Sequence, residues 1–326
     1  RYNASPSMKD YSFSNPLVSP DEVKTWLDAL PRPVAVTGGT GFVGSHLVDT
    51  LCAAGVKPRV LVRNPDIPRW IAGAPADWVA GSLADSHALE RLVEGAGTVF
   101  HLAGVLRAGR ERDFDTANRL GTANLVAALR ESAGSARLVH VSSLAGVGPS
   151  PTPAGLGPEV EPAPISWYGR SKLGAEREAR KWAEGGGWVI LRPPAIYGPR
   201  DSDVFEFFRM ASRGLVALPG GDRWLTVAWV GDVVRSILAA VAVEAGGLFH
   251  LGEPEPLRLD DLISELCEAG GVEARVVRVP PWLVSGAGAM GSALQKLGWR
   301  RIALTSDKSR ELLARHWTAR TADSLE

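Results

Sequence analysis

Short apolar runs that alternate with longer amphipathic segments constrain the fold of this chain more than any other feature. Val34 to Val36 and Val60 to Val62 are typical runs, and Asp113 to Arg130 and Tyr168 to Glu184 are the clearest helical segments. Such runs indicate strands buried on both faces, and strands alternating with helices form a parallel sheet covered by helices. We therefore predict an α/β fold with a doubly wound parallel sheet. Further strand-like runs are Trp78–Ala80, Thr98–His101, Leu138–Val141, Trp188–Leu191 and Leu248–Gly252.

A glycine-rich loop follows the first of these strands and opens the first helix. Gly38, Gly41 and Gly44 fall at G-x-x-G-x-x-G spacing. The first glycine permits a tight turn, the second lets a diphosphate approach the backbone, and the third lets helix and strand pack closely. Between a strand and an amphipathic helix, this loop predicts a Rossmann-type dinucleotide site.

The pattern also predicts how the chain is divided. Residues 31–198, completed by about 226–252, are assigned to the Rossmann domain, and 199–225 with 253–326 to a smaller C-terminal substrate-binding lobe. Residues 1–30 are predicted to be a mobile N-terminal extension with a short helix near its end. Helices outside the sheet domain are expected at Asp21–Leu30, Asp203–Arg213, Leu259–Ala269 and Lys308–His316.

The composition of the chain excludes some classes of binding partner and indicates a cellular compartment. The 36 basic and 36 acidic residues cancel, which argues against nucleic acid or an anionic membrane as the main partner. Cys52 and Cys267 are too few for a disulfide framework, so reduced thiols and a cytoplasmic location are expected. No apolar run reaches the ~20 residues of a membrane span. The six histidines form no ligand-spaced cluster, and we predict no metal.

The residue at the end of the second strand bears on the choice of nicotinamide cofactor. An acidic side chain there would accept hydrogen bonds from the ribose 2′-hydroxyl, whereas this chain has Arg63 and no carboxylate before Asp66. Guanidinium matches phosphate geometry, so NADP(H) is favoured, with NAD(H) as the alternative.

Candidate catalytic residues lie in two further segments. Tyr168 and Lys172 are spaced to share one helix face, where an ammonium stabilises a phenolate and lowers the pKa of the tyrosine. A serine from Ser142-Ser143 could hold a carbonyl or alcohol oxygen while the proton moves. The proline-rich stretch Pro149 to Pro164 lies between them, either as a lid over the site or as a surface insertion.

Together these motifs resemble the extended short-chain dehydrogenase/reductase family, which includes NAD-dependent epimerases and dehydratases, over about Pro33 to Gly252. The segments that carry the likeness are Thr37–Gly44, His101–Gly104, Thr116–Thr122, Val141–Ser143, Trp167–Lys172, Arg192–Pro199 and Trp229–Val233. The cofactor-binding residues that the resemblance implies are Gly38, Thr40, Gly41, Phe42, Val43, Gly44, Arg63, Leu83, Leu102, Ala103, Gly104, Tyr168, Lys172, Pro193, Ala195 and Ile196.

The resemblance also implies catalytic roles. Tyr168 would be the general acid/base, Lys172 would bind the nicotinamide ribose, and Asn118 would help to order the site. Counting back from Val147-Gly148, where relatives often carry Tyr-Gly, favours Ser143 over Ser142 as the residue that positions the reacting oxygen.

Three positions depart from the family pattern. Ser82 replaces an acidic residue that often follows the third strand, and nearby Asp85 is better placed to cap the next helix. Val147 replaces a tyrosine that lies near the substrate in sugar-modifying relatives. Leu144-Ala145 stands where sugar-nucleotide dehydratases carry Asp-Glu, so elimination by their mechanism is disfavoured.

These features favour hydride transfer between NADP(H) and a ketone/alcohol pair. Arg63 and the 193–199 and 304–308 segments are most similar to the dihydroflavonol-reductase and 3β-hydroxysteroid-dehydrogenase branches, which act on bulky, rather apolar compounds. A nucleotide-sugar 4-epimerase with tightly bound NAD is the alternative, and a non-catalytic nucleotide-sensing module is a third. A homodimer is common among relatives and is one option here.

Several aromatic and apolar residues have more than one possible role. Trp167, Trp224 and Trp229 are candidates for walls of a substrate pocket, although packing is the commoner role of aromatic residues. Pro280 to Val284 and the Gly/Ala-rich run that follows are the most apolar part of the second lobe. Packing is expected there, with contact to substrate or to a membrane surface as alternatives.

Overall fold

A seven-stranded parallel sheet forms the centre of the computed structural model, which describes residues 13–64, 69–132, 134–183, 187–202, 209–297, 299 and 304–321. The strand order β11-β6-β5-β4-β1-β2-β3 is that of a doubly wound sheet, and every neighbouring pair is parallel. The predicted α/β class is therefore confirmed. The strands are β1 (Val34–Thr37), β2 (Arg59–Val62), β3 (Asp77–Ala80), β4 (Thr98–His101), β5 (Arg137–Val141), β6 (Trp188–Arg192) and β11 (Leu248–His250).

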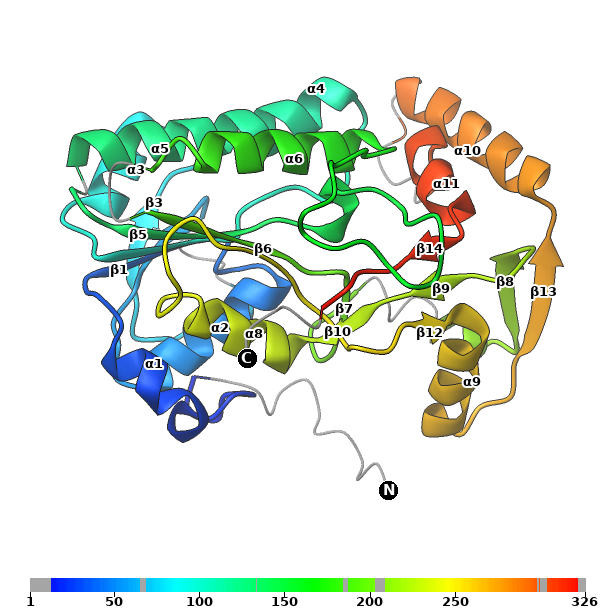
Figure 1. Cartoon of the computed structure of the whole chain (residues 1–326), viewed down its shortest axis with the longest axis horizontal. Coiled ribbons are helices and arrows are strands. Elements are labelled where there is room, and N and C mark those ends of the chain that lie inside the picture. The colour runs from blue at the N-terminus through cyan, green and yellow to red at the C-terminus, as the bar shows by residue number, and fades with distance from the viewer. Residues whose placement is uncertain are drawn as a thin grey trace.

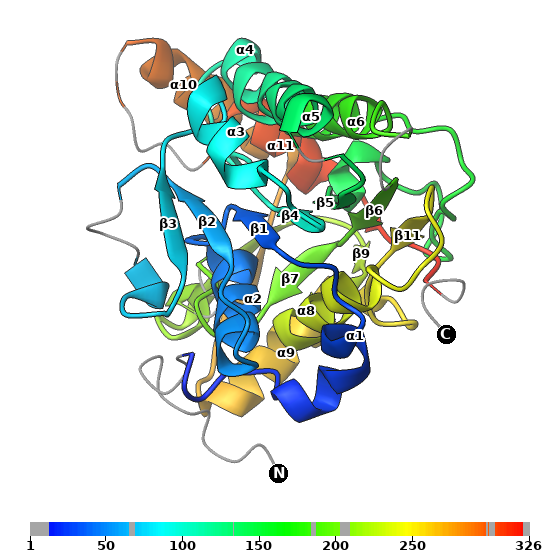
Figure 2. The same cartoon turned by 90° about the vertical axis from the view of Figure 1, so that its left-hand side faces the viewer.

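Helices cover both faces of this sheet, as Figure 2 shows. In β1, Val34 and Val36 pack into one buried cluster and Ala35 into the other, because successive side chains of a strand point to opposite faces. Residues of α2 (Phe42–Ala53) and α8 (Val230–Ala239) complete the first cluster. Residues of α3 (Ser86–Val93), α5 (Gly121–Ser132) and α6 (Trp167–Ala179) complete the second. Strands buried on both faces explain the continuous apolar runs in the sequence.

The N-terminal segment differs from the mobile extension that the sequence suggests. From residue 13 it is packed, and it forms the 3₁₀ turn η1 (Pro20–Val23) and the short helix α1 (Lys24–Asp28). Val18, Val23, Leu27 and Leu30 are buried in the same cluster as α2 and α8. Burial of these four apolar side chains stabilises the packed segment, whereas a mobile tail would leave them exposed to water. The first twelve residues lie outside the described part.

The predicted helix at Asp113 to Arg130 has a more complex form. It consists of α4 (Glu111–Phe114), the π-helical turn η3 (Asp115–Leu120) and α5. The predicted helix at Tyr168 to Glu184 is α6, which begins at Trp167 because the Ser166 hydroxyl accepts a hydrogen bond from Gly169 N–H, and which ends at Ala179.

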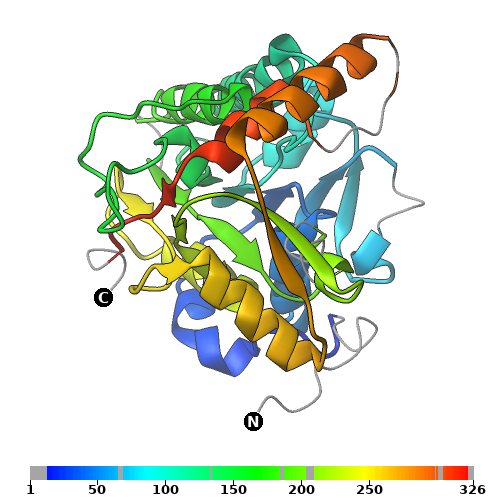
Figure 3. The ribbon, with the colours of Figure 1, turned by 90° about the vertical axis from the view of Figure 1, so that its right-hand side faces the viewer.

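The smaller lobe lies beyond the carboxyl ends of the strands, at the right of Figure 1, and Figure 3 views it directly. Its strands are β8 (Leu215–Pro219) with β13 (Arg275–Val279), and β9 (Trp224–Leu225) between β12 (Leu257–Arg258) and β14 (His316–Trp317). Its helices are α9 (Leu259–Gly270), α10 (Pro281–Lys296) and α11 (Ser306–Leu313).

Two details of the lobe bear on the predictions. The predicted helix at Lys308 to His316 stops at Leu313, and His316 instead begins β14. Most of the predicted Asp203 to Arg213 helix lies outside the described residues. Strands β7 (Ala195–Tyr197) and β10 (Val227–Trp229) pair with each other between the sheet and the lobe. The exact domain boundaries stay a prediction.

Candidate active site

The glycine loop leaves a cradle between β1 and the N-terminus of α2. Gly38 has φ +74°, and a Cβ at this position would lie 2.6 Å from the Ala103 nitrogen. A Cβ at Gly44 would lie 2.2 Å from the Gly38 carbonyl oxygen, so neither position accepts a side chain without displacement of the backbone. Close packing without side chains, next to the N–H groups of a helix start, fits the diphosphate of a dinucleotide. Thr40, Gly41, Phe42 and Val43 are all half-buried along this loop.

The ends of β2 and β3 place the residues expected around the adenosine. Arg63 follows β2 and is exposed. Leu83 packs against α5, because a Cβ at Gly121 would lie 2.7 Å from its side chain, and its carbonyl accepts a hydrogen bond from Asn124 at 2.8 Å. Asp85 caps α3 by accepting a hydrogen bond from Ala88 N–H, which is the role predicted for it.

Asn118 ties the loop after β4 to α6. Its Oδ1 accepts the Val105 N–H at 2.8 Å, and its Nδ2 donates to the Val105 carbonyl and, at 2.8 Å, to Ser171 Oγ. Ser171 in turn donates to the carbonyl of Tyr168 at 2.7 Å. The widened π turn carries Asn118, a type of irregularity that is frequent at functional sites. Gly104 lies between these groups, since a Cβ there would be 3.1 Å from Asn118 Oδ1 and 3.8 Å from Lys172 Nζ.

Lys172 is buried on α6 and points back toward the sheet. Its Nζ donates to the Val141 carbonyl, at the end of β5, at 2.8 Å. Burial lowers the pKa of Lys172 to about 8, and the nearby Glu176 carboxylate opposes this shift. Tyr168, one turn earlier on α6, is half-buried and packs its ring 6.1 Å from that of Phe114.

The geometry separates the two candidate serines that follow β5. Ser142 is buried and donates to Glu176 Oε1 at 2.6 Å. Ser143 is half-buried, and its Oγ accepts the Ala145 N–H at 3.2 Å, which leaves its hydroxyl hydrogen available. The role of Ser143 in positioning the reacting oxygen stays a prediction.

A buried ion pair fixes the chain where β6 ends. Arg192 binds Glu176 through two bonds, Nε to Oε1 at 2.8 Å and Nη2 to Oε2 at 2.6 Å, and both side chains are at most 2% exposed. His250 lies at the end of β11. Its Nε2 is 3.4 Å from Arg192 Nη1, and its Nδ1 is 3.0 Å from the Leu156 carbonyl oxygen. These contacts assign the ring proton to Nδ1, and burial lowers the pKa of His250 to about 4.

A second buried ion pair fixes the far end of the same segment. Arg200 has φ 72° and contacts Asp49 on α2, with Nη2 to Oδ2 at 2.7 Å. Burial raises the pKa of Asp49 to about 6, which Arg200 opposes. The segment 192–200 is thus held at one end by α6 and at the other by α2, on opposite faces of the sheet. It contains Pro193, Ala195 and Ile196, the residues expected near the nicotinamide.

The proline-rich loop is attached to the C-terminal part of the chain. Ser150 N–H donates to the His316 carbonyl at 2.8 Å, and Leu156 forms a bridge with Ala319. The neighbouring helix α11 reaches α6 itself, because the buried Asp307 carboxylate accepts the Trp167 N–H at 2.8 Å. The second lobe is therefore bonded to the residue that precedes Tyr168.

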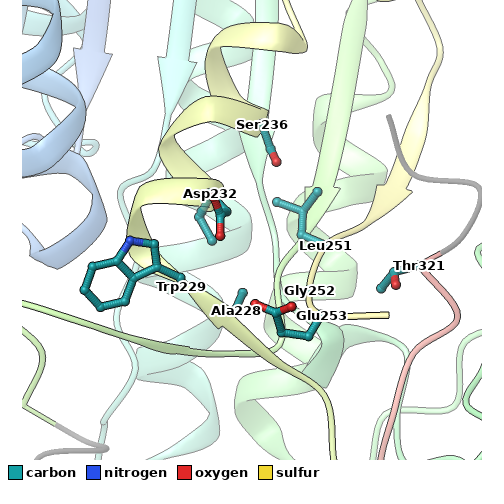
Figure 4. A pocket seen from close by; sticks show the side chains of 9 residues that line it. Ala228, Trp229, Asp232, Ser236, Leu251, Gly252, Glu253 and Thr321 are labelled. Atoms are coloured by element: carbon teal, nitrogen blue, oxygen red, sulfur yellow. The ribbon is translucent and has the colours of Figure 1, made fainter. Parts of the chain in front are cut away.

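One cavity of about 180 Å³ lies between α8 and the chain after β11 (Figure 4). Its lining residues include Trp229, Asp232 and Glu253 but none of the predicted catalytic residues. It is smaller than most ligand pockets, so we do not assign it to the reaction. Trp229 also packs beside Tyr197, with ring centroids 5.4 Å apart.

Several residues that hold the site together were given no role from the sequence, although Thr37, Thr122 and Arg192 lie within its motif segments. Thr37 and Thr122 hold the buried His101 at 2.6 and 2.8 Å, and Thr37 Oγ1 also accepts the Ala103 N–H. Thr122 could have been suspected from its position one turn after Asn118. The contacts of the others within the site involve partners that are distant in sequence: Ser171, Glu176, Arg192, Arg200, His250 and Asp307.

Known proteins are similar to this chain over most of its length. The chain is 33% identical over 300 residues to a ceramide reductase of Caulobacter vibrioides, covering 90% of this chain and 88% of that protein. It is 28% identical to a human sterol-4-alpha-carboxylate 3-dehydrogenase (decarboxylating), covering 76% and 69%. The UDP-glucose 4-epimerase of Thermus thermophilus, solved in complex with NAD, matches with a TM-score of 0.66 and 26% identity, over 85% of this chain and 98% of that one.

The described helices include none with both the length and the apolar character needed to cross a membrane. The model of the NAD dependent epimerase/dehydratase family matches residues 34–252, from the first strand of the sheet to the last. With that match and the sheet order, the chain belongs to the NAD dependent epimerase/dehydratase family, whose members are NAD(P)-dependent enzymes of the extended short-chain dehydrogenase/reductase type.

Proposed function

We propose that this enzyme is an NADP(H)-dependent oxidoreductase that interconverts a bulky, apolar ketone and its secondary alcohol. The observation that carries the proposal is the fixed face of α6. Asn118 and Ser171 hold this helix from one side, and Lys172 is bonded to the end of β5, where Ser143 follows. Tyr168, Lys172 and Ser143 are thereby supported by independent contacts, as a preorganised proton-transfer site requires.

In the direction of reduction, each residue has a distinct task. Ser143 donates a hydrogen bond to the ketone oxygen, and Tyr168 gives that oxygen its proton. The Lys172 ammonium stabilises the phenolate left on Tyr168, and with a pKa of about 8 it remains mostly charged near neutral pH. The nicotinamide, when bound, supplies the hydride, or accepts it in the direction of oxidation.

Arg63 supports the proposed preference for NADP(H). It is exposed at the end of β2, where a guanidinium can bind a ribose 2′-phosphate. We expect Arg63→Ala to raise the KM for NADPH about tenfold or more, the loss of one charge-assisted contact, and to leave the KM for NADH nearly unchanged. Equal effects on both cofactors would contradict this assignment.

The relatives support a bulky apolar substrate. Ceramide reductase and the sterol dehydrogenase are named for apolar lipids. Val147, at the position where sugar-modifying relatives often carry tyrosine, is 1% exposed and packs against Leu144 and Ala319, so it offers no polar group to a sugar. The structural similarity to a UDP-glucose 4-epimerase supports the alternative, in which the same residues oxidise and re-reduce a nucleotide sugar around a retained NAD.

A single assay series distinguishes these functions. Purified enzyme is given NADPH with a panel of long-chain and polycyclic ketones, and separately UDP-sugars without added cofactor. Stoichiometric oxidation of NADPH supports the reductase, whereas sugar epimerisation with retained NAD supports the epimerase. Tyr168→Phe should lower kcat by about 10²- to 10⁴-fold while NADPH binding is retained.

Ser143→Ala and Ser142→Ala are a matched pair in the same assay. Only Ser143→Ala should lower kcat strongly, because Ser142 donates to Glu176 and not toward the substrate. Full turnover by Tyr168→Phe would make the catalytic assignment wrong. If the wild type turned over no substrate yet bound nucleotide, the sensing module would be favoured.

We also propose a cytoplasmic location and a homodimeric assembly. Cys52 and Cys267 are free thiols, which supports a reducing, cytoplasmic environment. The homodimer is proposed from the family resemblance alone.

A further inference from the structure

Helix α10 exposes an apolar face that an ordinary surface helix would not have. Trp282 is 71% exposed, Leu283 44% and Met290 64%, and Leu297 directly after the helix is 78% exposed. The described side chains on the exposed face of α10 include no charged group; they come from Pro281, Trp282, Leu283, Ser285, Gly286, Ala287, Ala289, Met290 and Ala293. A helix that faces water usually carries charged residues on that side.

The opposite face of α10 is already occupied. Val284, Gly288 and Gly291 are buried on this face, and a Cβ at Gly288 would lie 2.7 Å from Ser309 Oγ of α11. Ser292 Oγ accepts the Ser306 N–H at 2.8 Å, which fixes the register of the two helices. The outer face is therefore set by this packing, and Figure 3 shows α10 along the periphery of the lobe.

The stretch of sequence that contains α10 departs from the neutrality of the whole chain. From Ala274 to Ser306 the sequence has five basic residues and no acidic residue. They are Arg275, Arg278, Lys296, Arg300 and Arg301, and the charge of Arg278 is paired with Asp260 of α9. An apolar face within a segment that has no acidic residue suits a surface whose interior is apolar and whose outer groups are anionic.

Aromatic residues flank the face at both ends. Trp282 is in the first turn, and Trp299, 65% exposed, follows the C-terminus. Tryptophan favours the boundary between lipid headgroups and acyl chains. With 16 residues, α10 is about 24 Å long, shorter than the ~30 Å hydrocarbon core, so it can lie along a bilayer but not cross it.

We propose that α10 docks this enzyme on an anionic lipid bilayer, with the exposed face of α10 and Leu297 in the headgroup boundary. The helix is close to the candidate site in the fold: it packs on α11, whose Asp307 bonds the Trp167 N–H. Loop 104–109 also runs from Gly104, beside Lys172, to Gly109, beside Gln295 of α10. An apolar substrate could pass from the bilayer to the site along loop 104–109, and this step rests on the proposed function. The docking of α10 does not depend on it.

Vesicle flotation of the full chain tests the docking. The variant Trp282→Ser/Met290→Ser removes the two most exposed large apolar side chains of α10 itself, and Leu215→Ser is the matched control, because Leu215 is 50% exposed on β8. We expect wild type and control to bind phosphatidylglycerol/phosphatidylcholine vesicles, with about tenfold or greater loss in the double variant. Binding to phosphatidylcholine alone should be weaker, by about fivefold for each basic residue near the surface.

Two results would overturn the proposal. The first is equal vesicle binding by wild type and the double variant, and the second is no binding by the wild type. If, in the second case, the wild type is a dimer that the double variant dissociates, this face is a contact between two copies. NADPH oxidation with a water-soluble ketone, without vesicles, is measured in parallel. Its absence would count against the proposed reaction and leave the docking result standing.

Discussion

Helices α6 and α10 invert the usual relation between polarity and burial in opposite ways. α6 carries Lys172 and Glu176, two charged residues that are each at most 5% exposed. α10 carries Trp282 and Met290, two apolar residues that are each more than 60% exposed. Charged groups are rarely buried without partners, and large apolar groups rarely gather at the surface.

The difference shows that the two helices are constrained by different partners. In α6 the partners are inside the chain, since Lys172 meets Val141 and Glu176 meets Arg192 and Ser142. In α10 no comparable partner covers the exposed face among the described residues. Breaking the contacts of α6 should therefore damage the folded state itself, whereas changes on the outer face of α10 should affect stability little.

The largest effect is expected at the Glu176–Arg192 pair. Glu176→Gln keeps the shape of the side chain but leaves the Arg192 guanidinium buried without a counter-charge. The free energy of unfolding should fall by about 3–5 kcal/mol, as is usual when one partner of a buried pair is removed. Urea denaturation followed by circular dichroism measures this change.

An exposed pair provides the control for that experiment. Asp28→Asn breaks the contact between Lys24 and Asp28, whose side chains are 69% and 64% exposed. Its effect should stay below about 1 kcal/mol, because water screens such pairs. If Glu176→Gln were no more destabilising than Asp28→Asn, the buried pair would not be the anchor of segment 192–200.

A somewhat smaller effect is expected from the titration of Lys172. Its pKa is lowered from 10.5 to about 8 in the folded chain, so the folded state releases this proton at a lower pH than the unfolded state. The unfolded state then binds more protons, and stability must rise as the pH rises from about 8 to about 10.5. Between about pH 7 and pH 10 the gain should be about 2–3 kcal/mol.

Lys172→Met isolates this contribution. The difference in unfolding free energy between wild type and variant should change with pH in the stated direction, whatever the other groups do. The nearby His101 and His140 do not interfere, because burial lowers the pKa of both, that of His101 to about 3. Parallel stability curves for the two proteins over this range would show that Lys172 is not desolvated.

The contrast between the helices also explains how far sequence reasoning reached. The sheet was predictable because both-face burial makes each strand a continuous apolar run, and Gly38, Gly41 and Gly44 have a fixed spacing that geometry requires. The preference for Ser143 over Ser142 rested on counting, and the contact of Ser142 with Glu176 supplies a physical reason for it.

Contacts between distant segments were the part that no local pattern could reveal. Arg192 and Glu176 are ordinary charged residues in sequence, and only the fold brings α6 against the end of β6. The packing of Val18 and Leu27 was missed because a stretch rich in Ser and Pro resembles a solvated tail. The apolar run at α10 was recognised, yet exposure cannot be read from hydropathy, since buried and membrane-facing helices share the same composition.

The smallest effects should distinguish the two faces of α10 itself. Gly286 and Gly288 are two residues apart in the same helix, and both lack a side chain for different reasons. A Cβ at Gly286 meets nothing within 4 Å, whereas a Cβ at Gly288 would approach Ser309 Cβ to 2.8 Å and the Thr305 carbonyl to 2.9 Å. Gly286→Ala should therefore stabilise the protein by about 0.5–1 kcal/mol through helix propensity, and Gly288→Ala should destabilise it by about 1–3 kcal/mol through overpacking.

Both changes in the free energy of unfolding are measured as shifts of the urea midpoint at constant slope. If Gly286→Ala were as destabilising as Gly288→Ala, another part of the protein would cover the outer face, and α10 would then be an internal helix like α6 and not a surface open to a partner.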